Sequence, residues 1–152
     1  MATVAELSID EETGPLKEIA AHKGWEFERL DDLRFSLGLP ARDGTMFWLL
    51  CDCDRYPSVP PAWHWYNPKT EMRDQPKDTP KGGTFFHQQS KVICAPWNRL
   101  TYKSENPHGP HSDWAIGDWR ANPRTGACKT LPAMALRIAV ELRAPAYEGR
   151  GG

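Results

Sequence analysis

Residues 51–65 read CDCDRYPSVPPAWHW, and this stretch decides the fold that the sequence predicts. It follows an apolar run of strand length, Thr45–Asp52, and leads into an aromatic-rich strand, Ala62–Asn67. At its centre lies Tyr56-Pro57-x-x-Pro60-Pro61. Each proline fixes its φ angle and donates no backbone hydrogen bond, and a tyrosine ring can pack over the prolines. We therefore expect a stiff connection between two neighbouring strands.

Two further strands are predicted before this stretch. WEFERL (25–30) and LRFSLGL (33–39) alternate apolar and polar residues, as half-buried strands do. Residues 40–44, PARDG, have the turn-forming residues that a hairpin needs. Strands that follow one another through hairpins pair in antiparallel fashion, so the four strands are predicted to form an antiparallel meander.

One helix is expected before the four strands in the chain and one after them, both covering one face of the sheet. Val4–Lys23 has apolar residues at helical spacing, and Gly24 is a plausible stop. Gly14-Pro15 either kinks that helix or marks its true start. Leu131–Arg143 is the clearest helical pattern, with Pro132 in its first turn. The apolar positions expected on the first helix are Val4, Leu7, Leu16, Ile19 and Ala20. The predicted fold is one α+β domain over residues 1–152.

The chain between the fourth strand and the last helix has little regular pattern. Asn67–Gly83 is polar and predicted to be a surface loop, and Thr84–Cys94 a short extended piece ending at the cysteine. Ala95–Lys129 has no sustained period, and an irregular stretch of this length inside a domain is usually functional. Its aromatic residues argue against disorder: Trp97, Tyr102, Trp114 and Trp119.

Composition excludes several classes of protein. A formal net charge of −1 gives no overall attraction to nucleic acid or to an anionic membrane. No apolar run approaches the roughly 20 residues of a membrane span, and the N-terminus does not read as a signal peptide. We therefore expect a cytoplasmic protein with free thiols. The four cysteines form no CxxC pair, and no spacing favours a metal site. Neither metal nor cofactor is predicted.

The Tyr-Pro-x-x-Pro-Pro connection is most informative together with Cys94, which lies between the predicted sheet and the last helix. In this combination the chain resembles the ubiquitin-conjugating enzyme family over roughly Ala5–Leu142. The resemblance implies a helix, a four-stranded meander, a catalytic cysteine in an extended segment, and C-terminal helices. It also implies an activity: the cysteine carries an acyl group as a thioester and passes it to a lysine.

The chain departs from the eukaryotic members of that family before and after the cysteine. They have a His-Pro-Asn triplet, whereas residues 84–88 here read TFFHQ. The stretch after Cys94 is longer and richer in His and Trp. These features resemble divergent bacterial conjugating enzymes of ubiquitin-like operons and of antiphage CBASS operons. The resemblance implies a partner with a C-terminal glycine, either a ubiquitin-like protein or a cGAS-like nucleotidyltransferase, and an activating enzyme.

Four residues are candidates for the site. Cys94 is the expected nucleophile, because a thiol attacks acyl groups well and leaves well. Asn98 either donates a hydrogen bond to the oxyanion or forms a turn. His108 and His111 either accept a proton from the thiol or the lysine, or cap loops.

Two other functions are consistent with the same residues. The fold could carry an inactive binding module, or an unrelated cysteine hydrolase that uses Cys94 with His108 or His111. Cys51 and Cys53 point to one face of their strand and are expected to pack in the core. The C-terminal residues Glu148–Gly152 are interpreted as a flexible or truncated tail rather than a ubiquitin-like one, since no ubiquitin-like domain precedes them.

Overall fold

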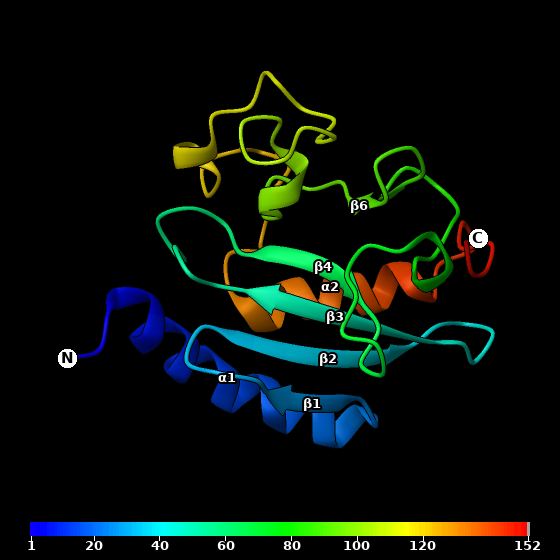
Figure 1. Cartoon of the computed structure of the whole chain (residues 1–152), viewed down its shortest axis with the longest axis horizontal. Helices are drawn as coiled ribbons and strands as arrows, with labels where there is room; N and C mark the ends of the chain where they lie inside the picture. The colour runs from blue at the N-terminus through cyan, green and yellow to red at the C-terminus, as the bar shows by residue number, and fades with distance from the viewer. Residues whose placement is uncertain (152) are drawn as a thin grey trace.

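A computed structural model describes residues 1–151, which form an α+β fold with two helices and a four-stranded sheet (Figure 1). The strands are β1 (Glu26–Arg29), β2 (Arg34–Pro40), β3 (Met46–Asp52) and β4 (Ala62–Tyr66). They pair in the order β1-β2-β3-β4, every pair antiparallel, so the predicted meander is confirmed. The helices are α1 (Val4–Lys23) and α2 (Leu131–Leu142).

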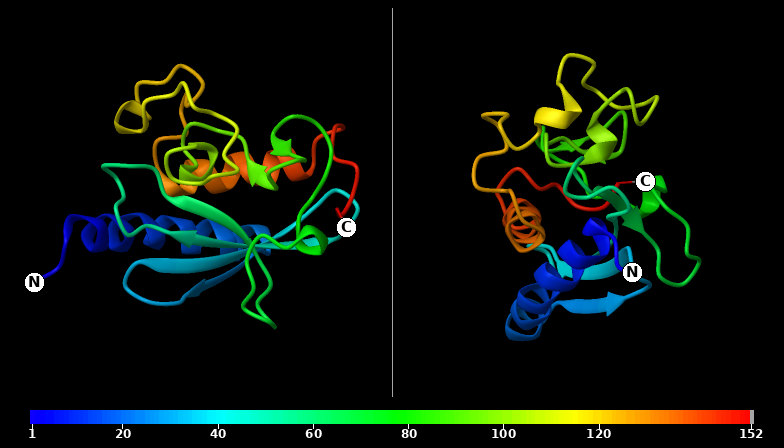
Figure 2. Two further views of the ribbon diagram at one scale, coloured as in Figure 1. Left: turned by 45° about the horizontal axis from the view of Figure 1, so that its top comes forward. Right: turned by 90° about the vertical axis from the view of Figure 1, so that its left-hand side faces the viewer.

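The core lies between one face of the sheet and the two helices. Successive side chains on a strand point to opposite faces, so the register sets which residues meet. Phe35 on β2 is paired with Cys51 on β3, and Cys51 with Trp63 on β4. Figures 1 and 2 show both helices on this same side of the sheet. The fully buried side chains contributed by α2 are Leu131, Met134, Ala135, Ile138 and Leu142.

Helix α1 is continuous from its N-cap, where the hydroxyl of Thr3 accepts a hydrogen bond from the backbone N–H of Glu6. Pro15 lies inside the helix, so a start at Pro15 is excluded. The buried face consists of Ala5, Ile9, Thr13, Leu16 and Ala20. Two positions predicted to be apolar contacts, Val4 and Leu7, are instead 69% and 58% exposed, because the face that meets the core is rotated toward Ala5 and Ile9.

The Tyr-Pro-x-x-Pro-Pro connection is tied to both helices by Tyr56, which is 1% exposed. Its hydroxyl donates to the carboxylate of Glu12 on α1 at 2.8 Å, and that carboxylate also accepts from the backbone N–H of Leu131 at 2.6 Å. The indole N–H of Trp119 donates to the carbonyl of Pro57 at 3.0 Å. The connection therefore joins α1, α2 and the irregular segment, an architectural role.

The piece predicted as one extended segment before Cys94 is a two-stranded hairpin. Strands β5 (Phe86–His87) and β6 (Val92–Ile93) pair in antiparallel fashion. The backbone N–H of Lys91 donates to the carbonyl of His87 at 2.9 Å, with Lys91 at a φ of 59°. Lysine rarely adopts this left-handed conformation, so the residues gave no sign of the turn.

Candidate active site

Cys94 directly follows β6, where the hairpin gives way to irregular backbone. Its N–H donates to the carbonyl of Phe85 at 2.8 Å, so the backbone of Cys94 is held by the residue just before β5. The next residue is anchored as well, because the N–H of Ala95 donates to the hydroxyl of Thr101 at 3.3 Å. The thiol itself is half-buried. Cys94 is thus fixed through its backbone while its side chain stays accessible.

His111 is brought to Cys94 by a fold of the irregular segment. Its N–H donates to the carbonyl of Thr101 at 3.0 Å, and its carbonyl accepts from the N–H of Lys103 at 2.9 Å. Gly109 permits this close approach, since a Cβ there would lie 2.8 Å from the backbone of Tyr102. Backbone pairing therefore sets the position of the histidine.

The three side chains of Cys94, His111 and Asp113 form a connected row. The Sγ of Cys94 lies 3.6 Å from Nε2 of His111, and Nδ1 of the same ring lies 3.3 Å from Oδ1 of Asp113. Trp114 stacks on the imidazole, with ring centroids 3.5 Å apart and planes 6° apart. A nucleophile beside a base, with a third group orienting that base, is an arrangement suited to acyl transfer.

The protonation of the thiol is set by two opposing effects. Burial raises the pKa of Cys94, and the positive charge of Arg124 acts in the opposite direction. The raised pKa means that the resting thiol holds its proton at neutral pH. A neighbouring base is therefore useful, since His111 can accept that proton as the sulfur attacks.

Cys94 opens onto a groove of about 580 Å³. Glycine is required on one side of it, because a Cβ at Gly82 would lie 2.0 Å from the carbonyl oxygen of Ala146. The groove is lined by Gly82–Phe86, Cys94–Trp97, Arg124, Arg137, Glu141, Ala146 and Tyr147. An open groove of this size, with a nucleophile in its wall, can admit an extended end of another chain.

Comparison of this chain with protein-family models, with curated proteins and with solved structures gives no significant match. The site must therefore be judged on its own geometry. In the part of the chain that the structure describes, no helix is long and apolar enough to cross a membrane.

Asn98 does not line the groove, so the structure gives no basis for the predicted oxyanion role. The residue is fully buried. Its amide oxygen accepts from the N–H of Trp63 on β4 at 3.0 Å, and its amide nitrogen donates to the carbonyl of Ile93 on β6 at 2.9 Å. The oxygen also caps a short 3₁₀ turn, Arg99–Thr101. The alternative prediction, turn formation, is what the structure shows.

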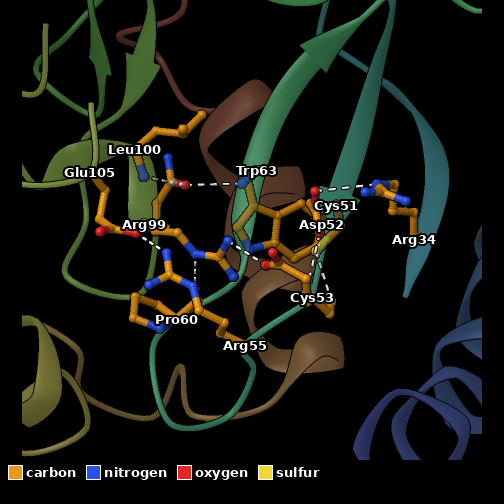
Figure 3. A network of polar contacts seen from close by, with 12 residues as sticks. Arg34, Cys51, Asp52, Cys53, Arg55, Pro60, Trp63, Arg99, Leu100 and Glu105 are labelled. Atoms are coloured by element: carbon orange, nitrogen blue, oxygen red, sulfur yellow. Dashed lines mark hydrogen bonds and ion pairs between the residues drawn. The ribbon is translucent and has the colours of Figure 1, made fainter. Parts of the chain in front are cut away.

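Arg99 fastens the same segment to the Tyr-Pro-x-x-Pro-Pro connection (Figure 3). Its Nε donates to the carbonyl of Pro60 at 3.0 Å, and its Nη1 pairs with Asp54 at 2.5 Å. Arg55 forms a second ion pair across the junction, with Glu105. The guanidinium of Arg99 is largely buried, so this junction holds the segment that carries the site against β4.

His108 is not brought to Cys94. It is exposed and lies at a separate hollow shared with His87, Ser90 and Pro110. Its N–H donates to the side chain of Asn106 at 3.2 Å, which is a local loop contact. Of the two histidines predicted as proton acceptors, only His111 has the required position.

The other cysteines lie away from the groove. Cys51 and Cys53 are fully buried, with their sulfur atoms 3.6 Å apart, so the predicted core packing is confirmed. Cys128 is also buried. Within residues 1–151, no group of three or more His, Cys, Asp or Glu side chains is placed to hold a metal ion.

The C-terminal residues are ordered against the loop before the hairpin. Glu148–Gly151 forms three backbone hydrogen bonds with Thr79–Lys81. The interpretation of this end as a flexible tail is therefore wrong for Glu148–Gly151, because its backbone groups are hydrogen-bonded to Thr79 and Lys81. Gly152 lies outside the described residues.

Three residues of the site were not predicted: Asp113, Trp114 and Arg124. The spacing His111-x-Asp113 was a usable signal, because a carboxylate two residues from a histidine can reach its ring in an irregular segment. Arg124 had no such signal, since its approach to Cys94 depends on how the whole segment folds.

Proposed function

We propose that this protein is a ubiquitin-conjugating-like acyltransferase that carries a partner's C-terminal glycine on Cys94 and passes it to a lysine. The observation that carries the proposal is the thiol of Cys94, which lies in the wall of an open groove and 3.6 Å from Nε2 of His111. The α+β arrangement supports it, with a four-stranded meander and a Tyr-Pro-x-x-Pro-Pro connection packed against both helices.

The proposed reaction has two acyl transfers. In the first, the sulfur of Cys94 attacks the activated carbonyl of the terminal glycine, His111 accepts the thiol proton, and the activating group leaves. His111 then passes that proton to the departing activating group and becomes neutral again. In the second, a lysine amine attacks the thioester, the C–S bond breaks, and the proton of the amine passes to His111, which returns it to the leaving sulfur. Asp113 orients the imidazole during both steps, and Trp114 holds the plane of the ring.

The partner follows from the resemblance in the sequence. A ubiquitin-like protein or a cGAS-like nucleotidyltransferase would supply the C-terminal glycine, and an activating enzyme would supply the high-energy acyl group. The setting we propose is bacterial antiphage defence, in the cytoplasm. The open groove beside Cys94, with Gly82 and Gly83 in its lining, supports an extended chain end as the substrate.

The test is adduct formation with a candidate partner and its activating enzyme, followed on a non-reducing gel. Wild-type protein should form an adduct that reductant cleaves. Cys94→Ser should form an ester that resists reductant but yields to hydroxylamine, and Cys94→Ala should form none. Cys128→Ala is the matched control and should keep the wild-type adduct. An adduct of undiminished yield in Cys94→Ala would sink the proposal.

A cysteine hydrolase is the second candidate, and the contact between His111 and Asp113 favours it. A Cys-His-Asp row serves hydrolysis as readily as transfer, since only the attacking group differs. The fate of the acyl group separates the two functions. A transferase retains the thioester until free lysine is added, whereas a hydrolase releases the free acid at the same rate with or without lysine.

A further inference from the structure

Arg124 lines the same groove as Cys94, although the two residues are far apart in the sequence. Its guanidinium carbon lies 5.9 Å from the ring centroid of Trp114, the same indole that stacks on His111. Within residues 1–151, no side-chain hydrogen bond or ion pair occupies the guanidinium. Arg124 therefore presents free N–H donors at the edge of the site.

The groove has a second cation, Arg137, but its charge is already compensated. Its Nε and Nη2 lie 3.0 Å and 2.9 Å from the carboxylate of Glu141 on the same helix. Its guanidinium also lies over the ring of Phe85, 5.2 Å from the centroid. Arg124 is consequently the positive charge of the groove that remains available to a bound group.

The positive charge of Arg124 already acts on the thiol of Cys94. Burial raises the pKa of Cys94, and the electrostatic influence of Arg124 opposes that rise. A negative charge that develops two bonds away from the sulfur, on an acyl oxygen, lies in the same electrostatic field. The amide of Asn98, the donor expected from the sequence, is bound to the backbone of Trp63 and Ile93.

We propose that Arg124 is the catalytic residue that stabilises the oxyanion in both acyl transfers at Cys94, an inference that rests on the proposed function. When the sulfur or the amine adds to the carbonyl carbon, the π electrons move to oxygen. Arg124 donates a hydrogen bond to that oxygen and keeps its proton. When the intermediate collapses, the carbonyl re-forms and the leaving group departs.

The experiment uses a synthetic peptide thioester that ends in glycine, so that neither a partner nor an activating enzyme is needed. Mass spectrometry follows acylation of Cys94 and then its discharge onto free lysine. Arg124→Gln should slow both steps about 100-fold, the effect of removing one oxyanion donor. Arg124→Lys should restore part of the rate. The matched control is Arg120→Gln, from a residue that stacks over Trp119 outside the groove and should leave both rates unchanged.

A second measurement separates an effect on the oxyanion from one on the thiolate. Alkylation of Cys94 by iodoacetamide has no oxyanion, so Arg124→Gln should slow it far less than acylation. An equal loss in both reactions would overturn the inference, as would wild-type acylation by Arg124→Gln. In either case the proposed function survives. If wild-type Cys94 is not acylated by the peptide thioester at all, the proposed function fails and this inference fails with it.

Discussion

Cys51 in the sheet and Cys94 in the irregular segment are both free thiols, but the two regions hold them in different ways. Cys51 lies in register between Phe35 and Trp63, fully buried, and burial raises the pKa of its thiol well above the usual value. Cys94 sits at the end of β6, half-buried, with His111 beside it. The sulfur of Cys51 packs in the core, whereas the sulfur of Cys94 lies beside the imidazole of His111 and in the wall of a groove.

The difference shows how each region positions a side chain. In the sheet, the two-residue period and the antiparallel register are sufficient to position each side chain, because every strand has the same backbone geometry. In Ala95–Lys129, specific hydrogen bonds from side chains to backbone do the positioning. The hydroxyl of Thr101 donates to the carbonyl of Ile93 at 2.9 Å, and that of Tyr102 to Pro96 at 2.6 Å. Packing fixes the first region, and individual polar contacts fix the second.

The largest contrast should appear in thiol alkylation of the folded protein. Iodoacetamide should label Cys94 at least about 1,000-fold faster than Cys51, because exposing Cys51 requires the sheet to open. Since the pKa of Cys94 is raised, its thiolate fraction at neutral pH is below that of a free cysteine, and labelling should accelerate as the pH rises. Mass spectrometry of peptides measures both rates. Comparable labelling of Cys51 would mean that the sheet is not the rigid region.

The next largest effect is expected when the proton acceptor, His111, is removed. His111→Gln should slow transfer from Cys94 to lysine about 100-fold, as expected for loss of a general base. Asp113→Asn should cost less, because Asp113 is largely exposed and only orients the ring. Single-turnover discharge of the thioester measures both. His108→Gln is the control, and an equal loss in that variant would show that local loop structure, not proton transfer, is responsible.

Asn98→Ala tests whether polar contacts support the irregular segment. It removes the acceptor of the Trp63 N–H and leaves that buried donor without a partner, so the free energy of unfolding should fall by about 2–3 kcal/mol. Urea denaturation measures the change. Asn122→Ala removes a surface cap on the N–H of Arg124 and should cost less than about 1 kcal/mol. Similar losses in the two variants would contradict the assignment of Asn98 as the main link between β4 and β6.

Tyr56→Phe should lower the free energy of unfolding less than Asn98→Ala does, by about 1–2 kcal/mol, because it removes one hydrogen bond to Glu12 and keeps the ring. It should also change the pH dependence of stability. Burial and the neighbouring carboxylate of Glu12 raise the pKa of Tyr56 above its usual value of about 10. The folded state therefore holds this proton more tightly, and stability is lost as the pH rises above about 10. Thermal melts across that range should show a weaker decline in Tyr56→Phe than in wild type.

Much of the fold could be read from local pattern. All four strands were predicted from the alternation of residues 25–39, the apolar run before the Tyr-Pro-x-x-Pro-Pro connection and the aromatic-rich stretch after it, and Gly24 marked the end of α1. The face of α1 was misjudged at Val4 and Leu7, because a helix does not reveal which side meets the sheet. A local sequence pattern predicts helices and strands reliably because their backbone geometry is the same from one residue to the next.

The candidate site could be predicted only in part. Cys94 was found from its place between the sheet and the last helix, and His111 was one of two equal choices. Both histidines lie in the same irregular segment, and the one sequence feature that distinguishes His111 from His108, an aspartate two residues after it, was not used. The sequence allowed Asn98 to be an oxyanion donor or a turn former, and its side-chain amide is hydrogen-bonded to the backbone of Trp63 and Ile93. These choices depend on contacts between residues distant in the chain.

By itself the sequence determined the order of helices and strands, the stiff connection around Tyr56, and the presence of one cysteine at the boundary between sheet and irregular chain. Only the tertiary structure decided that His111 lies beside Cys94 and that Arg124 enters the groove. The physical reason is that helices and strands follow from short-range periodicity. The row of Cys94, His111 and Asp113 follows from backbone pairing outside regular helices and strands, here between His111 and Thr101, and such pairing leaves no periodic trace in the sequence.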